Sequence, residues 1–287
     1  MAVAEAALLA RRFGEGHQIR YTRHMSERRV LFIGDVVGEP GRKAVERMLP
    51  ELIEQHAPAL VITNGENVAG GLGITERTAK KLFDAGTDVI TTGNHVYRHA
   101  EVYGFLDRSD RIVRPANYLE SNPGRGWVIV EKDGVRWAVL NLSGQVFVDA
   151  AYSPFHVADR LLAKLRDKAD YVIVDFHAEA TSEKVAMGWH LDGRVLAVIG
   201  THTHVPTADG RVLPGGTAYI SDAGMTGARG GVIGVKREQI IQRFLTQMPV
   251  RFETATDDPW LMGCLVTSKR PALASSIEQI LLPVRDG

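Results

Sequence analysis

The sequence predicts an α/β protein in which two mixed β-sheets pack face to face and helices cover their outer faces. In the first third of the chain, apolar strand-like runs alternate with helical patterns, which is typical of parallel β-α units. In the middle and near the end, strand-like runs follow one another directly, which favours antiparallel pairs. Because the first runs are continuously apolar, we expect their strands to be covered on both faces.

The first run with strong strand character starts near Arg29, and the segment before it has no partner pattern. We therefore predict an N-terminal extension over residues 1–27 and a single domain over residues 28–287. Two hypotheses explain the extension: either Met25 is the natural start, or the leader is a loosely held addition.

Three strand-like runs and two helical patterns follow in alternation. The strands are predicted at 29–35, 60–67 and 88–95, and the helices at 40–56 and about 75–85. The first helix opens with a proline and has apolar residues at i, i+3, i+4 and i+7, which places them on one helix face.

The second half of the chain begins with a predicted β-hairpin, because Asp133-Gly134 joins two strand-like runs. Beyond it we predict two helices and four strands: helices at about 157–168 and 238–247, and strands at 171–177, 196–204, 250–256 and 260–268.

Composition excludes several classes of protein. The chain has 287 residues, 34 basic and 34 acidic, so its formal net charge is +0 and we expect no extended nucleic-acid surface. A single cysteine, Cys264, permits no intrachain disulfide, and its apolar run favours a buried structural role. No apolar run is long enough to cross a bilayer, and the N-terminal charges follow rather than precede an apolar stretch. We expect a cytoplasmic protein with no membrane partner.

Five of the strand-like runs end in side chains that can bind a metal. These side chains are Asp35, Glu66, Asn67, Asn94, His95, His177, His202 and His204. Each has a structural explanation by itself, such as a helix cap, a polar turn or a histidine at the rim of the core. Five such endings together are hard to explain by packing. Because ligands at the carboxyl ends of strands can form one site, we predict a centre with two metal ions.

The strongest single piece is the run Gly200-Thr201-His202-Thr203-His204. In an extended chain, residues two apart point to the same side, so His202 and His204 are expected to face one cavity. Other catalytic motifs are missing from the sequence: no dinucleotide fingerprint follows the first strand, and no phosphate loop or nucleophile elbow occurs.

Read in order, GDVVG, GEN, GNH, DFHAE and GTHTHVP resemble the calcineurin-like metallophosphoesterase superfamily. Two positions depart from its general pattern: Val37 stands where most members carry a histidine, and Glu66 where most carry an aspartate. Those departures are marks of the bacterial YmdB-like phosphodiesterases, which the longer motifs TNGENVAGGLGIT, HAEATSEK and SDAGMTG also resemble.

The resemblance implies a metallophosphoesterase fold and a two-iron site that hydrolyses 2′,3′-cyclic nucleotides to nucleoside 3′-phosphates, with a metal-bridging hydroxide as nucleophile. Carried over by motif, one metal is held by Asp35, Glu66, Asn67 and His204. The other is held by Glu66, Asn94, His177 and His202. His95 is the acid that protonates the leaving oxygen. The oxygen and imidazole ligands fit iron or manganese, and zinc stays open.

Two alternatives stay open. The first is a broader phosphatase or phosphodiesterase acting on phosphomonoesters or RNA ends. The second is a regulatory metalloprotein that binds a nucleotide with little turnover. In each case the expected partner is a small phosphate-bearing molecule. The sequence does not indicate which residues bind the substrate beyond the metal centre. Assembly into a homo-oligomer stays open.

Overall fold

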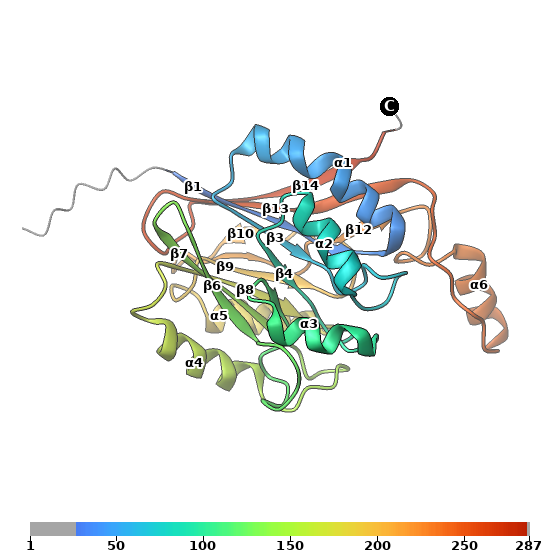
Figure 1. The fold of residues 1–287 in the computed structure, drawn as a ribbon, viewed down its shortest axis with the longest axis horizontal. Helices are drawn as coiled ribbons and strands as arrows, with labels where there is room; N and C mark the ends of the chain where they lie inside the picture. The colour runs from blue at the N-terminus through green and yellow to red at the C-terminus, as the bar shows by residue number, and fades with distance from the viewer. Residues whose placement is uncertain (1–26, 286–287) are drawn as a thin grey trace, which may run out of the picture.

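The structure, a computed structural model, describes residues 27–285. The predicted N-terminal extension therefore lies outside the described residues, except for Glu27. The described chain forms two β-sheets that lie face to face, with helices on their outer faces (Figure 1).

The first sheet has eight strands, seven of which follow the order β2-β12-β13-β1-β3-β4-β5, while β14 pairs with β13 from Trp260 to Thr267. Their bounds are β1 Arg28–Ile33, β2 Asp35–Val36, β3 Leu60–Asn64, β4 Val89–Thr91, β5 Ile112–Val113, β12 Met225–Ala228, β13 Pro259–Ser268 and β14 Ser276–Pro283. Strands β1, β3, β4 and β5 are parallel, whereas β13 is antiparallel to β1, β12 and β14.

The second sheet has six strands in the order β10-β11-β9-β8-β7-β6. Their bounds are β6 Trp127–Lys132, β7 Val135–Ser143, β8 Tyr171–His177, β9 Ala197–Thr201, β10 Arg211–Val212 and β11 Ala218–Ile220. Strands β7, β8, β9 and β11 are parallel, and the outer pairs are antiparallel. Both sheets are thus mixed, which confirms the predicted fold class.

Helices other than α6 cover the two outer faces of the sandwich. Their bounds are α1 Gly38–His56, α2 Glu76–Asp84, α3 Tyr103–Arg108, α4 Pro154–Leu165, α5 Thr181–His190 and α6 Arg237–Thr246, with a 3₁₀ turn η2 Ala100–Val102. One apolar cluster joins α1 and α2 to the first sheet, one lies between the sheets, and one joins α4 and α5 to the second sheet. Along β1, Phe32 faces the other sheet while Leu31 and Ile33 face the helices, which explains the continuously apolar run.

The hairpin between β6 and β7 is confirmed. Asp133 and Gly134 both have positive φ, 53° and 67°, as a two-residue turn of this kind requires. The strand predicted at 250–256 is wrong, because within the described chain this segment makes only one isolated bridge, through Thr254. The partner of β13 is instead β14, a strand that we had not predicted.

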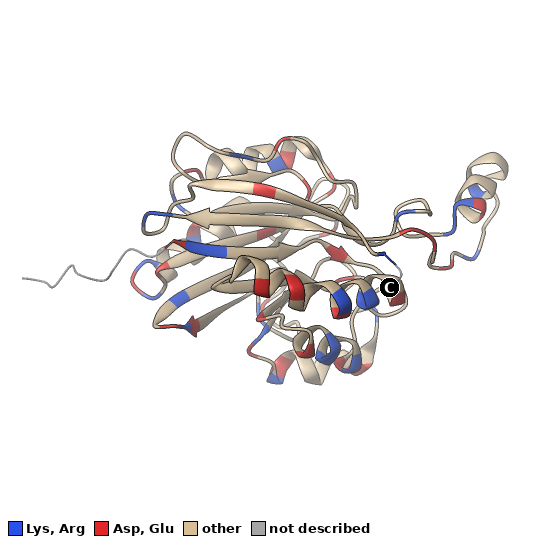
Figure 2. Ribbon diagram, turned by 90° about the horizontal axis from the view of Figure 1, so that it is seen from above, with Lys and Arg blue, Asp and Glu red and all other residues tan. Residues whose placement is uncertain are grey.

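Helix α6 stands away from the sandwich, and none of its side chains is buried (Figures 1 and 2). Figure 2 also shows basic and acidic residues interspersed over the helices and strands, as expected for a chain without net charge. Among the helices of residues 27–285, none combines the length and the apolar content that crossing a membrane requires.

Candidate metal centre

The predicted metal-binding side chains all lie at carboxyl ends of strands. Asp35 follows β1, and the Glu66-Asn67 and Asn94-His95 pairs follow β3 and β4, which are parallel neighbours in the first sheet. His177 ends β8, and His202 and His204 follow β9, its parallel neighbour in the second sheet. The same ends of the two sheets therefore supply the site.

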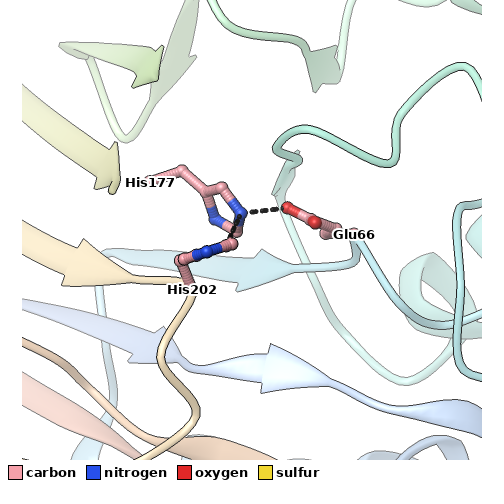
Figure 3. Close-up of side chains that lie close together, drawn as sticks. All are labelled: Glu66, His177 and His202. Atoms are coloured by element: carbon pink, nitrogen blue, oxygen red, sulfur yellow. Dashed lines mark hydrogen bonds and ion pairs between the residues drawn. The ribbon is translucent and has the colours of Figure 1, made fainter. Parts of the chain in front are cut away.

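Direct polar contacts connect all eight of these side chains. His177 is the hub: its Nε2 lies 2.5 Å from Glu66 Oε2, 3.0 Å from Asn94 Oδ1 and 3.0 Å from His202 Nδ1. Figure 3 shows the His177 ring lying between Glu66 and His202. Asp35 joins the group through its Oδ2, which accepts a hydrogen bond from the backbone N–H of His202 at 3.1 Å.

The other half of the group is built around Asn67. Its side chain lies 2.9 Å from His95 Nδ1 and 3.2 Å from His204 Nε2. His95 Nδ1 is also 2.8 Å from Glu66 Oε1, so Glu66 touches both halves. The structure thus brings together every side chain that we predicted for the site from the sequence.

The local geometry of the histidine pair differs from our prediction. Strand β9 ends at Thr201, and His202 and His204 both have positive φ, 100° and 66°. The chain is therefore not extended here, and the two-residue alternation of a strand does not apply. The turn nevertheless directs both rings into the cluster, one toward His177 and one toward Asn67.

The hydrogen bonds around His177 fix its tautomer. Its Nδ1 lies 2.9 Å from the hydroxyl of Thr201, and that hydroxyl donates to Asp175 Oδ1 at 2.7 Å. Because the hydroxyl proton is used in this way, Thr201 accepts the proton on His177 Nδ1. Once Nε2 loses its own proton, its lone pair faces the cluster, as metal ligation by imidazole requires.

Burial and neighbouring charge shift the titration of the cluster. Burial by itself raises the pKa of Glu66, but attraction to His177 and His95 holds that pKa well below its usual range. Burial by itself lowers the pKa of His177, yet the charges of Glu66 and Asp35 raise it to about 9. Burial and the nearby His177 lower the pKa of His202 to about 3. Without a cation, a proton on His177 thus balances Glu66.

The surroundings of the buried carboxylates favour a bound metal ion over hydrogen bonding within the protein. Among the described residues, no group gives a well-aligned hydrogen bond to Asp35 Oδ1 or to either Glu66 oxygen, although all three atoms are buried. Buried carboxylate oxygens without well-aligned donors are costly unless positive charge lies close to them, which here comes from a protonated histidine or from a bound cation. Glu66, His177 and His202 also offer ligand atoms that all lie within 4.8 Å of one another. The donor set of carboxylate, amide and imidazole suits divalent transition metals.

Gly93 makes this close approach possible. A Cβ at this position would overlap the Glu66 carboxylate and the His177 ring. The glycine that precedes Asn94 and His95 therefore leaves the space in which the ligands of two strands meet.

The sequence did not lead us to predict several residues that contact and support the cluster. Glu179 Oε2 lies 2.9 Å from His202 Nε2, on the opposite side of that ring from His177. Asp222 accepts hydrogen bonds from the backbone and hydroxyl of Thr203 and pairs with the buried Lys184 at 2.8 Å. Two features of the sequence could have indicated such supporting residues: Asp175 lies inside an apolar strand, and Asp222 lies directly after one.

The two-sheet sandwich, with ligands from the strand ends of both sheets, defines a metallophosphoesterase of the calcineurin-like kind. A family model described as YmdB-like protein matches residues 31–280. The chain therefore belongs to the YmdB-like protein family.

Similar proteins support this assignment. A 2′,3′-cyclic-nucleotide 2′-phosphodiesterase of Bacillus subtilis is 48% identical over 255 residues, covering 88% of this chain and 97% of the relative. The structure of a hypothetical protein from Thermus thermophilus is 43% identical, with a TM-score of 0.81 and coverage of 89% of this chain and 100% of that one. A structure described as a novel phosphatase of Mycoplasma pneumoniae is 35% identical, with a TM-score of 0.84 and coverage of 90% and 94%.

Proposed function

We propose that the protein hydrolyses 2′,3′-cyclic nucleotides to nucleoside 3′-phosphates at a centre of two metal ions. The observation that carries this proposal is the convergence of eight side chains from both sheets around buried carboxylate oxygens that lack well-aligned donors. The activity for which the Bacillus subtilis relative is named supports the choice of substrate.

The contacts support a division of the ligands into two sets that share Glu66. Asn94 and His202 both contact His177, whose Nε2 lies beside Glu66 Oε2. Asn67 and His204 touch each other on the side of Oε1, where His95 also lies. Asp35 contacts His202, so its place in the set of Asn67 and His204 rests on the family resemblance of its motif and not on a contact. We assign Asp35, Glu66, Asn67 and His204 to one ion, and Glu66, Asn94, His177 and His202 to the other, with iron as the expected metal and manganese or zinc as alternatives.

Two ions held in this way supply a water activated for attack and positive charge for the phosphoryl oxygens. His95 is the general acid in this proposal. Its Nδ1 faces Glu66 and Asn67, which hold the ring in place, and its side chain is 33% exposed, so Nε2 is open to a substrate. A protonated His95 would give its proton to the departing 2′ oxygen, because an alkoxide leaves poorly.

A substrate panel tests the proposal. Metal-loaded protein is incubated with 2′,3′-cyclic AMP, 3′,5′-cyclic AMP and p-nitrophenyl phosphate, and products are separated by chromatography. We expect the highest kcat/KM on 2′,3′-cyclic AMP, with 3′-AMP as product. Comparable turnover of p-nitrophenyl phosphate would favour a broader phosphatase. Binding of nucleotide without product would favour a regulatory metalloprotein.

A further inference from the structure

A cavity of about 350 Å³ adjoins the metal centre and shares His204 with it. His204 Nδ1 lies 2.9 Å from the carbonyl oxygen of Ile233, which can only accept, so this nitrogen carries the proton. Nε2 therefore points its lone pair toward Asn67 and the metal ligands. One side of the ring thus belongs to the metal centre, while its other nitrogen contacts the wall of the cavity.

The lining of the cavity is apolar apart from His204 and one cation. The guanidinium of Arg229 lies over the indole ring of Trp260, 4.4 Å from its centroid. The indole N–H donates to Asp258 Oδ1 at 2.9 Å, which holds the ring in one orientation. Val205 and Ile233, also in the lining, are 57% and 52% exposed. Both side chains are therefore accessible to a ligand that enters the cavity.

We propose that this cavity is the subsite for the nucleobase of a nucleotide substrate, an inference that rests on the proposed function. Because the cavity shares His204 with the proposed metal centre, a substrate whose phosphate is held there can extend into it, and the cavity has a volume typical of small-molecule sites. A base is flat and apolar on its faces and has hydrogen-bond acceptors on its edge. An oriented indole next to apolar side chains suits the faces, and the guanidinium suits the edge.

The test compares a substrate that has a base with one that has none. The variants Trp260→Leu and Arg229→Met are assayed on 2′,3′-cyclic AMP and on glycerol 1,2-cyclic phosphate. We expect the ratio of kcat/KM for the two substrates to fall about tenfold in each variant, through a higher KM for the nucleotide. The matched controls Trp189→Leu and Arg237→Met, which alter exposed residues outside the cavity, should leave the ratio at its original value. An unchanged ratio in both cavity variants would overturn the proposal.

Calorimetric binding of adenosine separates this proposal from the proposed function. If the wild-type chain hydrolyses neither cyclic phosphate but binds adenosine, and both cavity variants weaken that binding about tenfold, the subsite stands and the reaction does not. If the wild-type chain hydrolyses both substrates but all variants bind adenosine equally, the reaction stands and the subsite is wrong. Absence of both binding and hydrolysis would contradict both proposals.

Discussion

At the level of single residues, the identities of the clustered side chains were accessible from sequence, but their conformations were not. Polar residues at the ends of apolar runs indicate candidate ligands because strand ends of parallel sheets share an edge. The positive φ angles of His202 and His204 were not accessible, since they depend on a turn held by Asp222 through Thr203. The link from His177 through Thr201 to Asp175 is likewise a consequence of the pairing of β8 with β9.

Replacing His95 by alanine tests its role as the acid. Because the predicted metal sets do not include His95, His95→Ala should retain two metal ions per chain and lose about 10²–10⁴-fold in kcat on 2′,3′-cyclic AMP. Steady-state kinetics combined with metal analysis gives both quantities. His99→Ala is the matched control, because His99 bonds the carbonyl of Leu72 rather than the cluster. Wild-type turnover in His95→Ala would remove the proposed role.

Asp209 is expected to contribute to the pH dependence of stability. Burial by itself raises its pKa, but hydrogen bonds from Ser221 and Thr207 lower it below the usual value. A carboxyl with a depressed pKa in the folded state stabilises that state above the unfolded pKa of about 4 and loses this contribution as pH falls through the folded pKa. Asp209→Asn should therefore be less stable at pH 7, by about 1 kcal/mol for a half-buried group.

Urea unfolding at several pH values measures this contribution. The difference between wild-type and Asp209→Asn protein should shrink as pH falls from 6 toward 3. A difference that stayed constant over this range would show that ionisation of Asp209 does not contribute.

At the level of elements, the sequence predicted α1, α2, α4 and α6 with shifts at their ends, but it missed the helices α3 and α5 and most of the short strands. Helix α1 begins two residues before the predicted proline, and α4 begins and ends three residues early. Such limits depend on tertiary packing, which local patterns do not encode. The missed strand β14 has a single buried residue, Ile280, and its exposed Glu278 and Gln279 interrupt the apolar residues, so its sequence lacks a continuous apolar run.

The turn after β4 depends on the missing side chain of Gly93. Gly93→Ala should separate Glu66 from His177, since the added methyl group occupies the space where they meet. We expect the purified variant to bind less than one metal ion per chain by elemental analysis. Gly104→Ala is the control, because its Cβ would meet only the end of the Arg108 side chain, at 3.2 Å. Full metal content in Gly93→Ala would show that the turn can shift at little cost.

The buried ion pair between Lys184 and Asp222 connects α5 to the turn that carries His202 and His204. Lys184→Met leaves the Asp222 carboxylate buried without its cation, so we expect a loss of about 3–5 kcal/mol in the free energy of unfolding. Lys80→Met, which removes an exposed pair with Glu76, should cost less than about 0.5 kcal/mol. Similar losses in the two variants, measured by urea unfolding, would contradict a special role for the buried pair.

At the level of the whole molecule, the sequence predicted a sandwich of two mixed sheets, and this prediction is confirmed. Alternation of strand and helix patterns indicates parallel strands, and hairpin patterns indicate antiparallel ones. The positions of the candidate ligands indicate which ends of the strands lie close together. They do not indicate a cavity beside the metal centre, because its walls come from four separate segments: the residues after β9, the start of β12, the loop that follows it, and the β13-β14 pair. Such a cavity exists only once both sheets have formed.

The central claim is that strand ends of both sheets hold two metal ions that share Glu66. Anomalous X-ray scattering from crystals of metal-loaded protein, measured at the absorption edge of the bound metal, tests it directly. The account predicts two peaks, one beside Asn67 and His204 and one beside Asn94, His177 and His202, with the Glu66 carboxylate between them. A single peak, or peaks away from these side chains, would contradict it.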